Sequence, residues 1–367
     1  MPLFHFNNIK ISAVSAAVPS NEIDITSFYS DFGQEYVNKF SESTGVKTVR
    51  HTRPYQTASD LAYAAADNIL ETKNIDRSDI KALVFVAHST DYRRPATACV
   101  LHKRLNLSKD CAAFDINLGC SAFVYGLQTV CSMMTNSDID MALLLVGETM
   151  SKLANPKDKS VAMLFGDSGA AILLEKTSNK SEIKGLLKTD GSGYQAIIAP
   201  GGGARFPDAP VSEFVCKDGS VRSLYNSIMQ GEDVFSFTIS DVPKAIKEFL
   251  SRTSTTIDDY DCLAFHQANQ FIHKLLAKKI KADLAKMPLC INKYGNTSAG
   301  AIPLLLCDMF GKSAEAKSLK FLFCGFGVGL SWGVASAEIS CEDILPVFED
   351  DSVFEEGIIT HPNELCP

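Results

Sequence analysis

The sequence predicts an α/β fold built from two similar halves, and three observations support this prediction. Continuous apolar runs such as ALVFVA (82–87) and ALLLV (142–146) alternate with helical patterns, which is typical of strands that helices cover on both faces. Three stretches of the first half recur in the same order in the second. The chain, at 367 residues, is also long for one compact core.

The recurring stretches combine short apolar strands with glycine turns, and their spacing along the chain is similar. The pairs are SDIKALVFVAH (78–88) with DDYDCLAFH (258–266), FDINLGCSA (114–122) with CINKYGNTSA (290–299), and MALLLVGE (141–148) with LKFLFCGF (319–326). Three matches in one order indicate a duplicated unit.

A helix is predicted for TASDLAYAAADNIL (57–70). Thr57 and Asp60 have the spacing of a capping box at its start, and apolar residues recur at i, i+4 and i+8 from Leu61. The region 190–210 is rich in glycine and proline and can hold neither a helix nor a central strand, so we expect a long surface excursion there. We therefore divide the chain into an N-terminal half, 1–189, and a C-terminal half, 190–340.

The remaining segment, 341–367, is an acidic C-terminal extension with eight acids and no Lys or Arg. We expect a solvated, disordered tail, and the alternative is that its apolar stretch ILPVF (344–348) docks on the body. The net charge of −8 is the charge of this segment, because the rest of the chain has as many acidic as basic residues. This balance argues against a nucleic-acid-binding surface.

The sequence also argues against a membrane-spanning, secreted, disulfide-bonded or metal-binding protein. The apolar runs are too short to cross a membrane, and the first residues lack a secretory signal, so we expect a cytoplasmic location. The eleven cysteines include no CxxC pair, which argues against a disulfide framework or a metal cage.

One cysteine differs from the rest in its setting. Cys120 follows Gly119 between a strand-like and a helix-like run, and a helix N-terminus lowers the pKa of a thiol by presenting free N–H groups to the thiolate. If the two halves pack about a pseudo-twofold axis, the matching turn with Asn296 faces Cys120, and His266 ends a strand nearby. This convergence predicts a Cys120, His266 and Asn296 site for acyl transfer.

Simpler interpretations stay open for each of these residues. Most of the other cysteines, Cys99 and Cys131 among them, are expected to be core residues. His88 and His102 are interpreted as capping or hydrogen-bonding residues. YGNTSAG (294–300) is also compatible with a plain turn and a helix N-cap.

These residues also lie in four motifs, FDINLGCSAF, FHQAN, YGNTSAGAIP and GFGVGLSWG. The motifs resemble those of the β-ketoacyl-acyl-carrier-protein synthase III family of the thiolase superfamily, and the likeness covers roughly residues 8–340. The resemblance implies the thiolase fold, with two αβα halves in five layers, and usually a homodimer.

The resemblance also implies a reaction without a cofactor or a metal. Cys120 would accept an acyl group from a thioester such as a coenzyme A thioester, and His266 and Asn296 would hold a malonyl group on acyl carrier protein while it loses CO2. The resulting enolate attacks the acyl-cysteine and gives a 3-oxoacyl product in fatty-acid or secondary-metabolite biosynthesis. The backbone N–H groups of Cys120 and Val328 would form the oxyanion hole.

Several positions depart from the family pattern. Val328 replaces the middle residue of a usual triple glycine and can serve as a donor only if its φ is negative. Lys39 and Ser43 stand where a Trp and an Arg commonly grip coenzyme A, and Phe271 replaces an Arg that meets the carrier protein. Arg94 stands where an apolar side chain usually enters the acyl pocket of the partner subunit, so we expect altered substrate contacts and a specialised homologue.

Two competing functions remain. Relatives with the same fold move an acyl group to an alcohol or amine without decarboxylation, and these often lack the Asn. The other alternative is a non-catalytic partner subunit of a heterodimeric synthase, which the presence of Cys120, His266 and Asn296 disfavours.

Overall fold

The computed structural model describes residues 3–313 and 317–365, and its core contains two large sheets. The first sheet has six strands in the order β17-β2-β8-β7-β5-β6. Their bounds are β2 Ile9–Val18, β5 Ile80–Val86, β6 Ala112–Ile116, β7 Met141–Thr149, β8 Asp167–Lys176 and β17 Phe348–Glu349.

The second sheet has five strands in the order β1-β9-β16-β15-β14. Their bounds are β1 Phe4–Asn7, β9 Glu182–Thr189, β14 Cys262–Phe265, β15 Ser318–Gly327 and β16 Ser331–Ser340. Smaller strands lie outside the two sheets: β3 Glu22–Asp24, β4 Thr48–Arg50, β10 Ile197–Ile198, β11 Phe214–Val215, β12 Val221–Arg222 and β13 Ile228–Met229.

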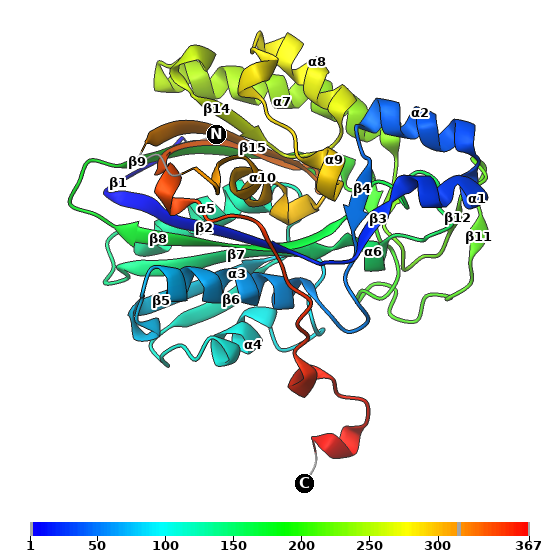
Figure 1. Ribbon diagram of the computed structural model, residues 1–367, viewed down its shortest axis with the longest axis horizontal. Coiled ribbons are helices and arrows are strands. Elements are labelled where there is room, and N and C mark those ends of the chain that lie inside the picture. The colour runs from blue at the N-terminus through cyan, green and yellow to red at the C-terminus, as the bar shows by residue number, and fades with distance from the viewer. Residues whose placement is uncertain (1–2, 314–316, 366–367) are drawn as a thin grey trace.

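The helices complete five layers with the sheets (Figure 1). They are α1 Tyr29–Phe32, α2 Gln34–Thr44, α3 Ala58–Thr72, α4 Thr97–Arg104, α5 Ala122–Met134, α6 Met150–Leu153, α7 Gly231–Thr253, α8 Gln270–Ile280, α9 Ile291–Tyr294 and α10 Ala301–Phe310. Helices α3 and α4 cover the outer face of the first sheet, α5 and α10 lie between the sheets, and α7 and α8 cover the outer face of the second. The fold implied by the family resemblance is thus confirmed.

The central strands are apolar throughout because both of their faces are buried. In β7, Leu144 packs with the helices between the sheets, whereas its neighbours Leu143 and Leu145 pack against α3 and α4. Successive side chains of a strand point to opposite faces, so a continuous apolar run is what a doubly covered strand requires. The predicted helix at the start of the first half is α3, and the capping box of Thr57 and Asp60 is present.

The duplication predicted from the sequence is visible in the strand order. In the first sheet β5 is parallel to β7, and β8 is antiparallel to both β7 and β2. In the second sheet β14 is parallel to β15, and β16 is antiparallel to both β15 and β9. One repeat pair differs, because the counterpart of β6 in the second half is the short helix α9 and not a strand.

The strands at the two ends of the chain each belong to the sheet of the opposite half. Strand β1 joins the second sheet by pairing with β9, and β17 joins the first by pairing with β2. The division at residue 189/190 therefore separates the turn of Cys120 from His266 and Asn296, but it leaves β9 on the N-terminal side of the boundary although this strand belongs to the second sheet.

The expectation of a disordered C-terminal extension is wrong for the described residues. Ile344 and Leu345, in the ILPVF stretch, are buried, and β17 extends the first sheet. Further along, Asp351 forms an ion pair of 2.6 Å with Arg53, and the Phe354 ring lies under the guanidinium of Arg104. The acidic residues follow basic side chains of the body, which composition alone does not reveal. The last described residues extend away from the body (Figure 1).

Candidate active site

Cys120 lies in the turn that connects β6 to α5, the helix that lies between the two sheets (Figure 1). The turn packs tightly against the end of β15, because a Cβ atom at Gly327 would lie 2.7 Å from Cys120 Cβ and 2.9 Å from Sγ. Only a residue without a side chain fits there. The end of one sheet therefore holds the turn of the other in place.

The Cys120 thiol is partly buried and faces polar groups. Its Sγ lies 3.5 Å from Ser298 Oγ, and the backbone N–H groups of Val328 and of Cys120 itself also act on the thiol. Burial raises the pKa of Cys120 to about 11, and these contacts only partly oppose the rise. The backbone N–H groups lower the pKa of Cys120 as the sequence predicted, but desolvation of the thiolate outweighs them, so the predicted net lowering is not found in the free protein.

His266 directly follows β14 and is almost completely buried. Its N–H donates to the Cys324 carbonyl at 2.8 Å, and its ring stands edge-on to Phe326. Burial, with a smaller contribution from the nearby His273, lowers the pKa of His266 to about 3. The imidazole is therefore neutral at physiological pH.

Asn296 follows the left-handed Gly295, where a Cβ atom would lie 2.6 Å from the Leu164 carbonyl oxygen. The Asn296 N–H donates to that same carbonyl at 2.8 Å. Its side-chain Oδ1 accepts the Ser298 N–H at 2.9 Å, which fixes the orientation of the amide. The Nδ2 group is then the part of the side chain that can donate to a substrate.

The glycine loop after β15 is connected to the nucleophile turn. Val328 does not have a positive φ, so the condition set by the sequence for a backbone donor is met. Its carbonyl accepts the Ser331 hydroxyl at 2.7 Å, and Ser331 Oγ lies 2.7 Å from Ser121 Oγ. These contacts fix Val328 relative to Cys120.

A cavity of about 690 Å³ contains the predicted site. Cys120, His266, Asn296 and Val328 all line it. Most of its other walls are apolar, and they come from α6, the segment before β8, the excursion after β9, α7, α8 and the end of β15: Met150, Leu153, Leu164, Phe165, Ile197, Ile198, Met229, Val234, Phe235, Phe271, Ile272 and Phe326. A largely apolar cavity with a few polar groups at one end is suited to an acyl chain.

The positions that depart from the family pattern lie at different places. Phe271 is half exposed, lines the cavity and stacks on Phe235 with ring centroids 6.0 Å apart. Lys39 forms an exposed ion pair with Glu35 on α2. Arg94 is exposed and does not line the cavity of its own chain. The prediction for Arg94 concerns the pocket of a second subunit, so it stays a prediction.

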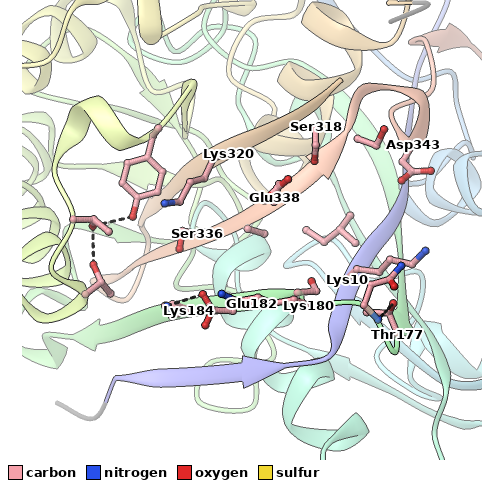
Figure 2. A pocket seen from close by; sticks show the side chains of 18 residues that line it. Lys10, Thr177, Lys180, Glu182, Lys184, Ser318, Lys320, Ser336, Glu338 and Asp343 are labelled. Atoms are coloured by element: carbon pink, nitrogen blue, oxygen red, sulfur yellow. Dashed lines mark hydrogen bonds and ion pairs between the residues drawn. The ribbon is translucent and has the colours of Figure 1, made fainter. Parts of the chain in front are cut away.

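A second cavity, of about 450 Å³, lies at the opposite end of β15 (Figure 2). Lysine side chains surround it, but Lys184 pairs with Glu182 at 2.9 Å, and Lys320 lies over the ring of Tyr260. It is lined by none of the predicted catalytic residues.

Three polar residues of the main cavity were not predicted to belong to the site. His88 was interpreted as a capping or hydrogen-bonding residue, and it does bond Asn117, but it also lines the cavity together with Asn117 and Ser298. A signal was present, because His88 follows β5 and Asn117 follows β6, and the carboxyl ends of adjacent parallel strands meet at one edge of a sheet.

Within the described residues, no cluster of three His, Cys, Asp or Glu side chains could hold a metal ion, and no helix is long and apolar enough to cross a membrane.

The five-layered fold and a cavity with Cys, His and Asn define an acyltransferase of the thiolase superfamily. Comparison with known proteins narrows this class. The family model for 3-oxoacyl-[acyl-carrier-protein] synthase III matches residues 114–191, and the model for the C-terminal part of this synthase matches residues 250–339.

Individual proteins agree with the family models. A putative 3-oxoacyl-[acyl-carrier-protein] synthase 3 from Campylobacter jejuni is 32% identical over 92% of this chain and 96% of its own length. A β-ketoacyl-[acyl-carrier-protein] synthase III from Clostridium beijerinckii is 32% identical over 90% of this chain and 99% of its own. The crystal structure of a 3-oxoacyl-(acyl-carrier protein) synthase from Burkholderia xenovorans LB400 has a TM-score of 0.90 at 33% identity and covers 95% of this chain and 99% of that one. The chain belongs to the 3-oxoacyl-[acyl-carrier-protein] synthase III family, as its motifs predicted.

Proposed function

We propose that the protein condenses an acyl thioester with a malonyl thioester through an acyl-Cys120 intermediate, with loss of CO2. The observation that carries this proposal is that Cys120, His266 and Asn296 line one cavity although they are far apart in the sequence. Membership in the 3-oxoacyl-[acyl-carrier-protein] synthase III family supports the same reaction.

In the first half-reaction, Cys120 Sγ attacks the thioester carbonyl and the carrier thiol leaves. The negative charge that develops on the carbonyl oxygen needs preorganised donors. The N–H groups of Cys120 and Val328, which act on the free thiol, are the proposed donors. Their position is supported by the Ser121, Ser331 and Val328 contacts.

In the second half-reaction, the malonyl group loses CO2 and its thioester carbonyl becomes an enolate. Two neutral donors fit this step, the His266 imidazole and the Asn296 amide. The enolate carbon then attacks the acyl-Cys120 carbonyl, and the 3-oxoacyl product forms as the thiolate of Cys120 leaves. The presence of Asn296 favours this reaction over transfer to an alcohol or amine.

The proposal extends to carriers and assembly. The acyl donor is a thioester of coenzyme A or of a carrier protein, and the malonyl group is carried by acyl carrier protein. We propose a homodimer, since β6 is an edge strand of its sheet and most of its residues are only partly buried. A cytoplasmic location and a reaction without a cofactor complete the proposal.

The acyl-enzyme provides the test. Incubation with a panel of acyl-CoA and acyl-carrier thioesters is expected to add one acyl group to the intact protein, with the mass located on the Cys120 peptide. Cys120→Ala should form no adduct, whereas Cys131→Ala and Cys99→Ala, the latter removing an exposed thiol, should acylate like wild type. An adduct that persists in Cys120→Ala would contradict the proposal.

A further inference from the structure

A second histidine faces the reaction chamber. His88 follows β5, lines the same cavity as Cys120 and lies next to the turn that follows β6. A Cβ atom placed on Gly119 would lie 3.0 Å from His88 Nε2 and 3.1 Å from Ser298 Oγ. His88 Nε2 and Ser298 Oγ therefore flank the same point of the nucleophile turn.

The His88 ring has a defined tautomer. Its Nδ1 lies 2.5 Å from Asn117 Oδ1, and an amide oxygen can only accept a hydrogen bond. Nδ1 therefore carries the proton, and Nε2 presents a lone pair in the neutral ring. Nε2 is buried and has no hydrogen-bond partner among the described residues. A buried hydrogen-bond acceptor without a partner lowers the stability of the fold, so its presence indicates a functional role.

The backbone that carries His88 is held firmly. Its N–H donates to Glu148 Oε1 at 2.8 Å, while the N–H and hydroxyl of Ser89 donate to Oε2 at 3.0 and 2.6 Å. Glu148 is completely buried at the end of β7, and burial raises its pKa. This carboxyl group interacts electrostatically with His88, and Cys120 and His266 are titratable groups that line the same cavity as His88.

The thiol proton of Cys120 needs an acceptor when the sulfur attacks a thioester. Cys120 Sγ contacts Ser298 Oγ at 3.5 Å, and this hydroxyl is close to the turn that His88 Nε2 also approaches. His266 is poorly suited to accept the proton, because burial strongly disfavours its charged form. A thiol that burial protects from ionisation needs another acceptor.

We propose that His88 Nε2 accepts the proton of Cys120 when Cys120 attacks the acyl thioester, once the Ser298 hydroxyl, which contacts Cys120 but does not bond Nε2 in the free protein, turns to bridge the two. The S–H bond of Cys120 breaks, its sulfur forms the new C–S bond, and the carrier thiolate leaves. The imidazolium of His88 then gives its proton to that thiolate, which departs as a thiol. In the condensation, which consumes one proton, the same path returns a proton to the Cys120 thiolate.

The test measures the reactivity of Cys120 without any acyl substrate, although the inference rests on the proposed role of Cys120 as nucleophile. The rate of iodoacetamide alkylation at Cys120 is followed by peptide mass spectrometry between pH 6 and 9.5. His88→Gln keeps a polar side chain but removes the base, and it should slow alkylation at pH 7 by about 10²-fold. Its rate should rise about tenfold per pH unit, as for an unassisted thiol, while wild type varies less steeply.

Controls separate proton transfer from a structural effect. His102→Gln changes a histidine on α4 that bonds the Ser108 carbonyl, and it should match wild type. Added imidazole should restore alkylation in His88→Ala but not in Ser298→Ala. Overlapping pH profiles of wild type and His88→Gln would overturn the inference, as would a lack of imidazole rescue in a folded His88→Ala. Neither result would bear on whether Cys120 is acylated, which the intact-mass experiment decides.

Discussion

Two buried histidines lie close together, His266 in the wall of the cavity and His273 outside its lining, and they link the site to stability. His273, on α8, is fully buried, and neither of its ring nitrogens has a hydrogen-bond partner among the described residues. Burial lowers the pKa of His273 to about 4, beside His266 with a pKa of about 3. Both rings are therefore neutral in the folded protein across the physiological range.

The unfolded chain behaves differently, because an exposed histidine has a pKa of about 6.5. Below that pH the unfolded state binds more protons than the folded state, so the free energy of unfolding falls as the pH drops from 6.5 toward 4. We predict that His273→Leu flattens this dependence by up to about 1.4 kcal/mol per pH unit and stabilises the protein at pH 5.

Urea unfolding at pH 7, 6 and 5 measures the effect, with His102→Gln as the control. Equal slopes in wild type and His273→Leu would show that His273 is already protonated in the folded state.

At the residue scale, the sequence could identify Cys120, His266 and Asn296 as candidates because each follows a recognisable turn or strand. The sequence also held a signal for His88, because one repeat ends in His88 where the other ends in His266, but it did not show that His88 lines the same cavity. Its relation to Asn117 depends on the pairing of β5 with β6, which is a property of the fold. The raised pKa of Cys120 likewise depends on burial by the other half.

At the scale of elements, the C-terminal segment gives the clearest test of packing. The Arg104 side chain is 7% exposed and pairs with Asp60 at 2.8 Å. Its guanidinium lies between the rings of Tyr63 and Phe354, 4.4 and 4.7 Å from their centroids. The segment thus covers a buried cation of α4.

We predict that Phe354→Ala lowers the free energy of unfolding by about 1–2 kcal/mol, because Arg104 loses an aromatic face and gains solvent. Ile359→Ala, at a side chain that is 44% exposed in the same segment, should have little effect. Chemical denaturation measures both variants. Equal stability of Phe354→Ala and wild type would mean that the segment is not bound in solution.

The comparison of the two halves at the sequence level does not predict every element correctly. The repeat of β6 is not a strand, because INKY (291–294) forms the helix α9 there, although the turn that follows keeps its place. The turn is fixed by Gly295 and by the Asn296 contacts to Leu164, whereas the preceding residues only need to reach it. Local sequence likeness therefore predicted the functional turn better than the element before it.

At the scale of the whole molecule, Arg94 tests the proposed homodimer. Arg94 is exposed in the single chain, and a lone charge inside an apolar pocket would cost several kcal/mol. If the partner subunit places this position at its acyl pocket, Arg94→Phe should shift acyl preference toward short, apolar chains at little cost to stability.

Arg93→Phe, at the exposed neighbouring position, is the matched control. Sedimentation equilibrium would first establish the dimer. An unchanged profile across acetyl, medium-chain and dicarboxylic thioesters in a dimeric Arg94→Phe protein would show that Arg94 does not shape the pocket.

The central claim is that one cavity performs both acylation and decarboxylation with separate residues. Asn296→Ala divides them, because the proposal gives its Nδ2 group a role at the malonyl carbonyl alone. Ser298 loses the Asn296 Oδ1 acceptor of its N–H in this variant, but its hydroxyl, which contacts Cys120, is unchanged. The most direct measurement is the release of labelled CO2 from a malonyl thioester by this variant, alongside its acylation by intact mass. We predict normal acylation of Cys120 and a loss of CO2 release of about 10²-fold or more. Unchanged CO2 release, or no release even by wild type, would contradict the claim and favour acyl transfer to an alcohol or amine.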